Sequence, residues 1–222
     1  MNSLFKRPKL DLEVNDRIWI SHNAGNPNVS VFMSLSNVGN RDVSIKSIQM
    51  LVSPSDGQQF ELPAKSFYPS LTDEKWVIFS RFKLYAGTQW DHTTIFWKPF
   101  SRNNEFLYRQ LSSAIKDDIS KKKGQPEFEK ILVEAEQKNV DSFVKFFDER
   151  FKWQRGEYTL TLTVVTDRDD VTASKKFRFT LFDSDVNQLR AYADKYRYGV
   201  GVYYFNREIQ APLDIPIVRS ES

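Results

Sequence analysis

The sequence contains no cysteine and only two histidines, and these absences remove several kinds of site at once. Without cysteine, the chain forms no disulfide bond, offers no thiolate to a metal ion and has no cysteine nucleophile. His22 and His92 are far apart in the sequence, so there is no His-x-x-x-His pair and no HExxH zinc site.

Glycine motifs that bind cofactors are missing as well. The eight glycines form neither GxGxxG nor GxxxxGK[ST], and no serine lies in a Gly-x-Ser-x-Gly elbow. We therefore expect no cofactor. These absences leave enzymatic activity open but favour a protein without it.

Long apolar runs and a one-sided charge are also absent. No apolar stretch approaches the roughly 18 residues that span a bilayer, and the N-terminal stretch lacks the apolar core of a secretory signal. The chain has 32 Lys and Arg against 29 Asp and Glu. Because nucleic-acid binding needs basic side chains concentrated on one surface, we expect no nucleic-acid partner. Membrane association is expected only if the basic residues Lys6, Arg7 and Lys9 follow an anchor that was removed.

What the sequence does contain is typical of a folded protein. Of its 222 residues, 40% are hydrophobic and 27% charged, and a chain of this length buries a large core without a metal or disulfide. We expect a single domain over residues 1–222. Its expected parts are strands at about 9–100 and 155–182, a helical insertion at about 101–153, and a C-terminal helix and tail at about 183–222.

The expected strands rest on alternating apolar and polar residues. Residues 29–35 alternate strictly, which is typical of a strand with one buried face. The apolar phase slips between Ile45 and Ile48, which predicts either a β-bulge or a strand that is covered on both faces. Residues 58–62 are interpreted as a short edge strand, and residues 63–72, which contain Pro69, as an irregular segment.

The helical insertion is expected from a change of period. Leu107, Leu111, Ile115 and Ile119 recur every four residues, as on one face of a helix. The expected boundaries are Gly124 as the end of this helix, Pro126 as the start of a second, Asn139 as its end, Asp141 as the cap of a third, Ser184 as the cap of the C-terminal helix and Gly199 as its end.

Four short motifs carry a resemblance to a known family. They are Val29-x-Val31-x-Met33-x-Leu35-x-Asn37-x-Gly39, Leu84-Tyr85-Ala86-Gly87-Thr88, Thr94-Ile95-Phe96-Trp97 and Gly156-Glu157-Tyr158-Thr159-Leu160. Over residues 29–100 and 155–182 the chain resembles the bacterial immunoglobulin-like domains, including the cell-adhesion-related family. The expected fold is therefore a β-rich, antiparallel immunoglobulin-like sandwich, with a helical insertion between late strands and a C-terminal helix.

The resemblance also carries expectations about roles. It implies binding, adhesion or spacing within larger proteins, without catalysis. It places Tyr158 at the family's corner position, where the hydroxyl hydrogen-bonds to the backbone near the entry of the strand. Family members join the two late strands directly, so the helical block is an addition to their pattern.

The densest aromatic stretch runs from Trp90 to Trp97. On a strand, Trp90, His92 and Phe96 share one face and Trp97 lies on the other, so both faces carry rings. One face is expected to be core. We expect the helices of 101–153 to cover the other face, because they must bury their own apolar stripes; the alternative is an exposed platform for a partner or a sugar. The candidate binding residues are thus Trp90, His92, Phe96 and Trp97, and no catalytic residue is predicted.

Three aspartates in a late turn are weak candidate metal ligands. Asp167, Asp169 and Asp170 offer carboxylates, and Ca²⁺ takes six to eight oxygen ligands. An EF-hand is excluded because Val171 stands at its fifth position and no glutamate closes the loop. Aspartate is a preferred turn residue, so a solvated hairpin turn is the favoured interpretation.

Together these observations favour a non-catalytic interaction or accessory module that binds a protein partner within a larger assembly, with the helical insertion as its specific surface. The alternative is a carbohydrate-binding or glycoside-acting protein that uses the strand from Trp90 to Trp97. Two carboxylates about 5–10 Å apart in a groove beside either tryptophan would favour the alternative. Burial of both rings would remove it.

Overall fold

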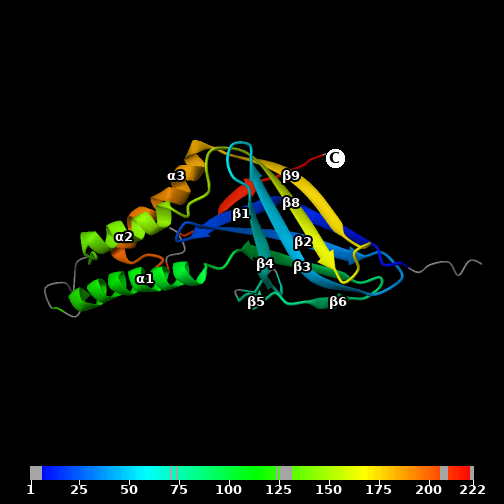
Figure 1. The fold of residues 1–222 in the computed structure, drawn as a ribbon, viewed down its shortest axis with the longest axis horizontal. Coiled ribbons are helices and arrows are strands. Elements are labelled where there is room, and N and C mark those ends of the chain that lie inside the picture. The colour runs from blue at the N-terminus through cyan, green and yellow to red at the C-terminus, as the bar shows by residue number, and fades with distance from the viewer. Residues whose placement is uncertain are drawn as a thin grey trace, which may run out of the picture.

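The computed structural model describes residues 7–70, 72–73, 75–123, 125, 132–205 and 210–220 (Figure 1). Its elements, in chain order, are β1 (Leu10–Asn23), β2 (Asn26–Asn37), β3 (Val43–Pro54), β4 (Phe60–Tyr68), β5 (Val77–Ile78), β6 (Phe82–Leu84), β7 (Gln89–Trp97), α1 (Arg102–Lys123), α2 (Gln137–Asp148), β8 (Gly156–Thr166), β9 (Ala173–Leu181), α3 (Asp183–Ala191), the 3₁₀ helix η2 (Ala193–Tyr198), β10 (Leu213–Pro216) and β11 (Val218–Arg219).

An antiparallel sheet that nearly closes into a barrel forms the body of the molecule (Figure 1). Its strand order is β10-β1-β2-β7-β4-β3-β8-β9-β11, with β5 paired to β4 and β6 paired to β3. The alternating residues of β2 and β8 point their apolar side chains into one shared core. The bulge expected in the third strand is confirmed, because the register of β3 against β8 shifts between Ile45 and Ser47.

Strand β4 joins the two halves of the sheet by changing partner along its length. Its first part, Phe60 to Pro63, pairs with β3, and its second part pairs with β7 after a register shift between Ala64 and Ser66. Proline has no N–H to give to a ladder and is therefore tolerated where a strand leaves its partner. The expectation of an irregular segment from Pro63 is thus wrong as far as Tyr68, because β4 continues through the proline and changes its partner strand there.

The C-terminal segment closes the opposite side of the sheet in the same way. β10 pairs with β1, and β11 pairs with β9. Pro216 is the last residue of β10 and pairs with Arg17, and the next residue, Ile217, donates its N–H to the carbonyl of Asp16 at 2.8 Å. Lys175 of β9 also contacts Glu13 of β1 at 2.7 Å. Two edges that would otherwise be open are therefore held together.

The helices form a body of their own at one end of the sheet (Figure 1). Helix α1 packs against α2 and η2 around a second apolar core, which includes Ile115, Ile119, Phe143 and Tyr196. The expectation that these helices cover the outer face of β7 is therefore wrong, because they bury their apolar stripes on one another. None of the helices in the described part of the chain combines the length and apolar character needed to span a bilayer.

Several helix boundaries differ from those expected. Residues 124 and 126–131, with the expected ends at Gly124 and Pro126, lie outside the described residues. Helix α2 begins at Gln137, so Asn139 and Asp141 lie inside it; the Asp118 carboxylate of α1 accepts hydrogen bonds from the Glu136 N–H at 2.9 Å and from the Asn139 amide at 2.8 Å. A cap supplied by another helix leaves no local pattern in the sequence.

The C-terminal helix also starts differently from the expectation. Ser184 is its second residue rather than its cap. The Asp185 carboxylate instead reaches back to the N–H of Phe182 at 2.8 Å. The expected end at Gly199 is confirmed for the helical stretch that continues through η2, since Gly199 has a φ of 82° at its C-terminus.

The turn between β1 and β2 docks against the end of α2. Gly25 has a φ of +87°, and a Cβ atom there would overlap the carbonyl oxygen of Phe147. The His22 ring packs on the Phe147 ring at 5.1 Å and on the Tyr192 ring at 4.9 Å between centroids. Glycine is therefore required at this joint both for its conformation and for its small size.

Gly25→Ala should destabilise the protein more than Gly87→Ala does. Both residues have positive φ, but a Cβ at Gly87 meets no atom within 4 Å. The backbone strain alone costs about 1 kcal/mol, and the overlap with Phe147 adds about 1–3 kcal/mol. Urea unfolding of the two variants measures the difference. Equal losses would mean that the turn does not dock closely on α2.

Candidate functional site

The outer face of the sheet carries a row of rings and small polar side chains. In register, Trp97 lies beside Asn28, and Asn28 lies beside Ser21. Ile95 lies beside Ser30 on one side and Ser66 on the other. Directly paired residues of neighbouring strands project from the same face, so strands β1, β2, β7 and β4 build one continuous surface.

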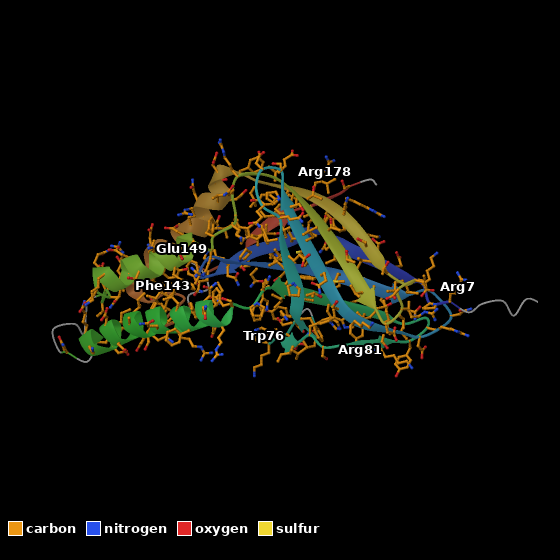
Figure 2. The ribbon with its side chains drawn as sticks, in the orientation of Figure 1. Arg7, Trp76, Arg81, Phe143, Glu149 and Arg178 are labelled. Carbon is orange, nitrogen blue, oxygen red and sulfur yellow. The ribbon has the colours of Figure 1, made fainter. Side chains whose placement is uncertain are left out.

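A groove of about 780 Å³ runs along this face to the first turns of α1. The described residues that line it are Ser21, Asn23, Asn26, Pro27, Asn28, Ser30, Ser66, Tyr68, Trp76, Ile95, Trp97, Pro99, Phe100, Glu105, Tyr108, Arg109 and Pro212. Trp97 is half-buried on a strand, whereas Trp76 is 55% exposed. Figure 2 shows Trp76 on the margin of the sheet. Aromatic rings thus stand both on the floor and at the rim.

The polar groups of the groove are mostly uncharged. The Asn26 amide donates to the carbonyl of Lys98 at 2.7 Å. The Asn28 Oδ1 is buried, and no described residue donates a hydrogen bond to it. The charged pair Glu105 and Arg109 meets at 2.6 Å across one helical turn. Apart from this compensated pair, the described lining presents aromatic rings, amides, hydroxyls, three prolines and Ile95.

The four predicted binding residues divide between the two faces of β7, as their alternation indicated. Phe96 is fully buried in the sheet core. Trp90 and His92 face the same way and pack together at 4.6 Å between centroids, with Phe67 against both rings. Burial lowers the pKa of His92. Only Trp97 reaches the groove, so the structure brings Trp90 and His92 together and separates them from Trp97.

The three candidate metal ligands lie in the hairpin turn between β8 and β9. Asp167 accepts the N–H of Ser44 at 3.0 Å, and this hydrogen bond is the main cause that lowers the pKa of its carboxyl group. Asp170 is paired with Arg168 at 3.2 Å. Asp169 also lies in this turn. Among the described residues, no group of three His, Asp or Glu side chains is close enough together to hold a metal ion.

His22 lines a smaller cavity of about 190 Å³ together with Tyr192 and Gln210. Its Nε2 donates to the carbonyl of Leu189 at 3.0 Å, which leaves Nδ1 to accept the N–H of Gly25 at 3.3 Å. Burial lowers the pKa of His22 to about 4, although the Leu189 carbonyl acts in the opposite direction. Because both nitrogens are engaged, this histidine has no free position for proton transfer.

The sequence alone does not predict most of the residues that line the groove. Asn28, Tyr68, Trp76 and Arg109 come from four separate segments, and no motif connects them. Period-two alternation assigns Trp97 and Asn28 to faces of their own strands. It does not say that those strands are neighbours, so the pairing needed the structure.

The fold and the groove define an antiparallel, β-rich protein with a separate helical body. No family model matches the chain, and no curated protein matches it. Among solved structures, it is similar to the crystal structure of the ApaA protein from Bordetella pertussis, with 9% sequence identity and a TM-score of 0.36 over 80% of this chain and 98% of that chain. A likeness at this level carries no conclusion about function.

The buried His22 should make stability depend on pH in the acid range. Its pKa of about 4 in the folded state lies below the value of 6.5 expected in the unfolded chain. Protonation therefore favours unfolding, and stability is lost as the pH falls from about 6.5 towards 4, by up to about 3 kcal/mol. Urea unfolding at pH 7 and pH 4.5 measures this loss. His22→Gln should show a smaller loss between the two pH values, and an unchanged loss would contradict the assignment.

Proposed function

We propose that the sheet is an immunoglobulin-like sandwich. The order β1-β2-β7-β4 corresponds to the A-B-E-D sheet of that fold, and β3-β8-β9 corresponds to its C-F-G sheet. A second observation supports this assignment. The Tyr158 hydroxyl donates to the carbonyl of Gln154 and accepts its N–H, both at 2.8 Å, as a corner tyrosine does. Helices α1 and α2 are then an insertion between strands E and F, and η2 joins them from the segment after strand G.

On this framework we propose a non-catalytic interaction module that binds a protein partner as part of a larger assembly. The observation that carries the proposal is the aromatic segment Tyr203–Phe205, defined as three consecutive rings on the surface of the helical body. Tyr203 is 41% exposed and Phe205 67% exposed. Contiguous exposed rings mark interaction sites more often than scattered ones do.

The surroundings of the aromatic segment support a protein partner. The Lys123 ammonium of α1 lies 5.1 Å from the Tyr203 ring centre and 5.9 Å from that of Tyr204. Beneath the segment, Val200 and Val202 are buried in the helical core. Tyrosine and phenylalanine that are held in place by a packed core are typical of the residues that dominate binding energy in protein interfaces.

The alternative function, carbohydrate binding or glycoside cleavage, is supported by the groove beside Trp97 rather than by the aromatic segment. Trp97 is only half-buried and lines a groove. Glycoside cleavage by the usual pair of carboxylates has less support than binding, because Glu105 is the one carboxylate in the described lining and Arg109 is bound to it. The second candidate function is therefore carbohydrate binding without cleavage.

Substituting both Tyr204 and Phe205 with serine should weaken partner binding by about 2 kcal/mol or more, since buried aromatic anchors contribute on this scale. The measurement is cross-linking in cells of the native organism, followed by binding assays with each purified cross-linked protein. The matched control is Phe182→Ser, because Phe182 is similarly exposed at 66% but lies outside the aromatic segment, at the N-cap of α3.

A partner that binds the wild type and the control, and loses affinity for the double variant, is the expected result. The same cross-linked proteins, bound with the same affinity by all three chains, would contradict the proposed role of the aromatic segment. Circular dichroism of the variants separates lost binding from lost folding.

A further inference from the structure

We propose that the groove beside Trp97 binds a neutral oligosaccharide. This inference rests on the second candidate function, carbohydrate binding, and makes it specific in ligand class and in position. It is independent of the aromatic segment Tyr203–Phe205, which does not line the groove in the described residues.

The rings of the groove suit the apolar faces of sugar rings. A pyranose presents a face of C–H groups, and an aromatic ring attracts such groups to its electron-rich face. Trp97 projects from a rigid strand whose neighbouring residue, Phe96, is fully buried. Tyr68 and Tyr108 add rings from β4 and α1. Because the floor is held by the sheet, little ordering is needed when a ligand stacks there.

The polar groups beside these rings suit hydroxyl groups. Asn28 is the register partner of Trp97, so an amide lies next to the stacking ring. Asn28 lines both this groove and the smaller cavity beside His22, and its Oδ1 is buried without a donor among the described residues, which is uncommon in folded proteins. Ser30 and Ser66 flank Ile95 on the same floor. A sugar hydroxyl both donates and accepts, so it matches amides and serines alike.

Charge and size narrow the ligand class further. Glu105 and Arg109 neutralise each other at 2.6 Å, so the described lining offers no uncompensated charge to a phosphate, sulfate or carboxylate group. The serines and asparagines of the floor disfavour a purely apolar ligand, which would leave them without partners. The volume of about 780 Å³ lies within the range of about 300–1,000 Å³ that is typical of ligand sites.

The test is calorimetric titration of the full chain with a panel of neutral tetrasaccharides built from glucose, mannose, galactose, xylose or N-acetylglucosamine. At least one should bind, and Trp97→Ala should weaken that binding by about tenfold or more because the stacking ring is lost. Trp97→Phe keeps a ring and should fall between Trp97→Ala and the wild type. Asn28→Ala should also weaken binding.

The control variant is Tyr85→Ala, which removes an exposed ring that does not line the groove and should leave the affinity unchanged. If Trp97→Ala does not fold by circular dichroism, Trp97→Phe and Asn28→Ala carry the test. The proposal is overturned if no member of the panel binds, if a sulfated oligosaccharide or an aliphatic alcohol binds more tightly, or if the groove variants bind as the wild type does. Partner binding through Tyr204 and Phe205 is unaffected by any of these results.

Discussion

The structure depends on closing both sides of one sheet with strands that change partner at a proline. Pro63 lies where β4 passes from β3 to β7, and Pro216 lies where the C-terminal segment passes from β1 to β9. A residue without an N–H loses nothing at a point where no ladder hydrogen bond is made. Each switch covers strand edges that would otherwise invite pairing with another chain, and together they enclose a single sheet core.

Closure of the sheet explains why the helices sit where they do. Because the inner apolar face of the sheet is already enclosed, the phenylalanines and isoleucines of α1 and α2 pack with η2 instead. The turn that contains Gly25, the His22 ring and Phe151, which packs against both cores, connect the sheet to the helices. The outer face of β7 is thereby left uncovered, and a groove lies between this face and the first turns of α1.

The parts of the fold that the sequence predicts are those marked by a pattern within one segment of the chain. Alternation located β2 and β8, the phase slip located the bulge near Ile45, and the four-residue period located α1. The irregular segment expected from Pro63 is wrong because β4 changes its partner strand there, and the helix boundaries expected at Asn139 and Asp141 are wrong because the capping carboxylate comes from Asp118 on another helix. Caps and partner changes made across the fold leave no spacing in the sequence.

The candidate site also combines features that local sequence patterns predict with features that depend on contacts across the fold. Period two correctly put Trp97 on the face opposite Phe96, which is a statement about one strand. Its neighbours on the groove floor come from pairings of β7 with β2 and β4 that are distant in sequence, and its wall comes from a helix that was expected to lie flat on that face. Because α1 stands at the end of the sheet instead, Trp97 is half-buried rather than covered. The helical core thus determines whether the aromatic strand is part of the interior or part of a surface.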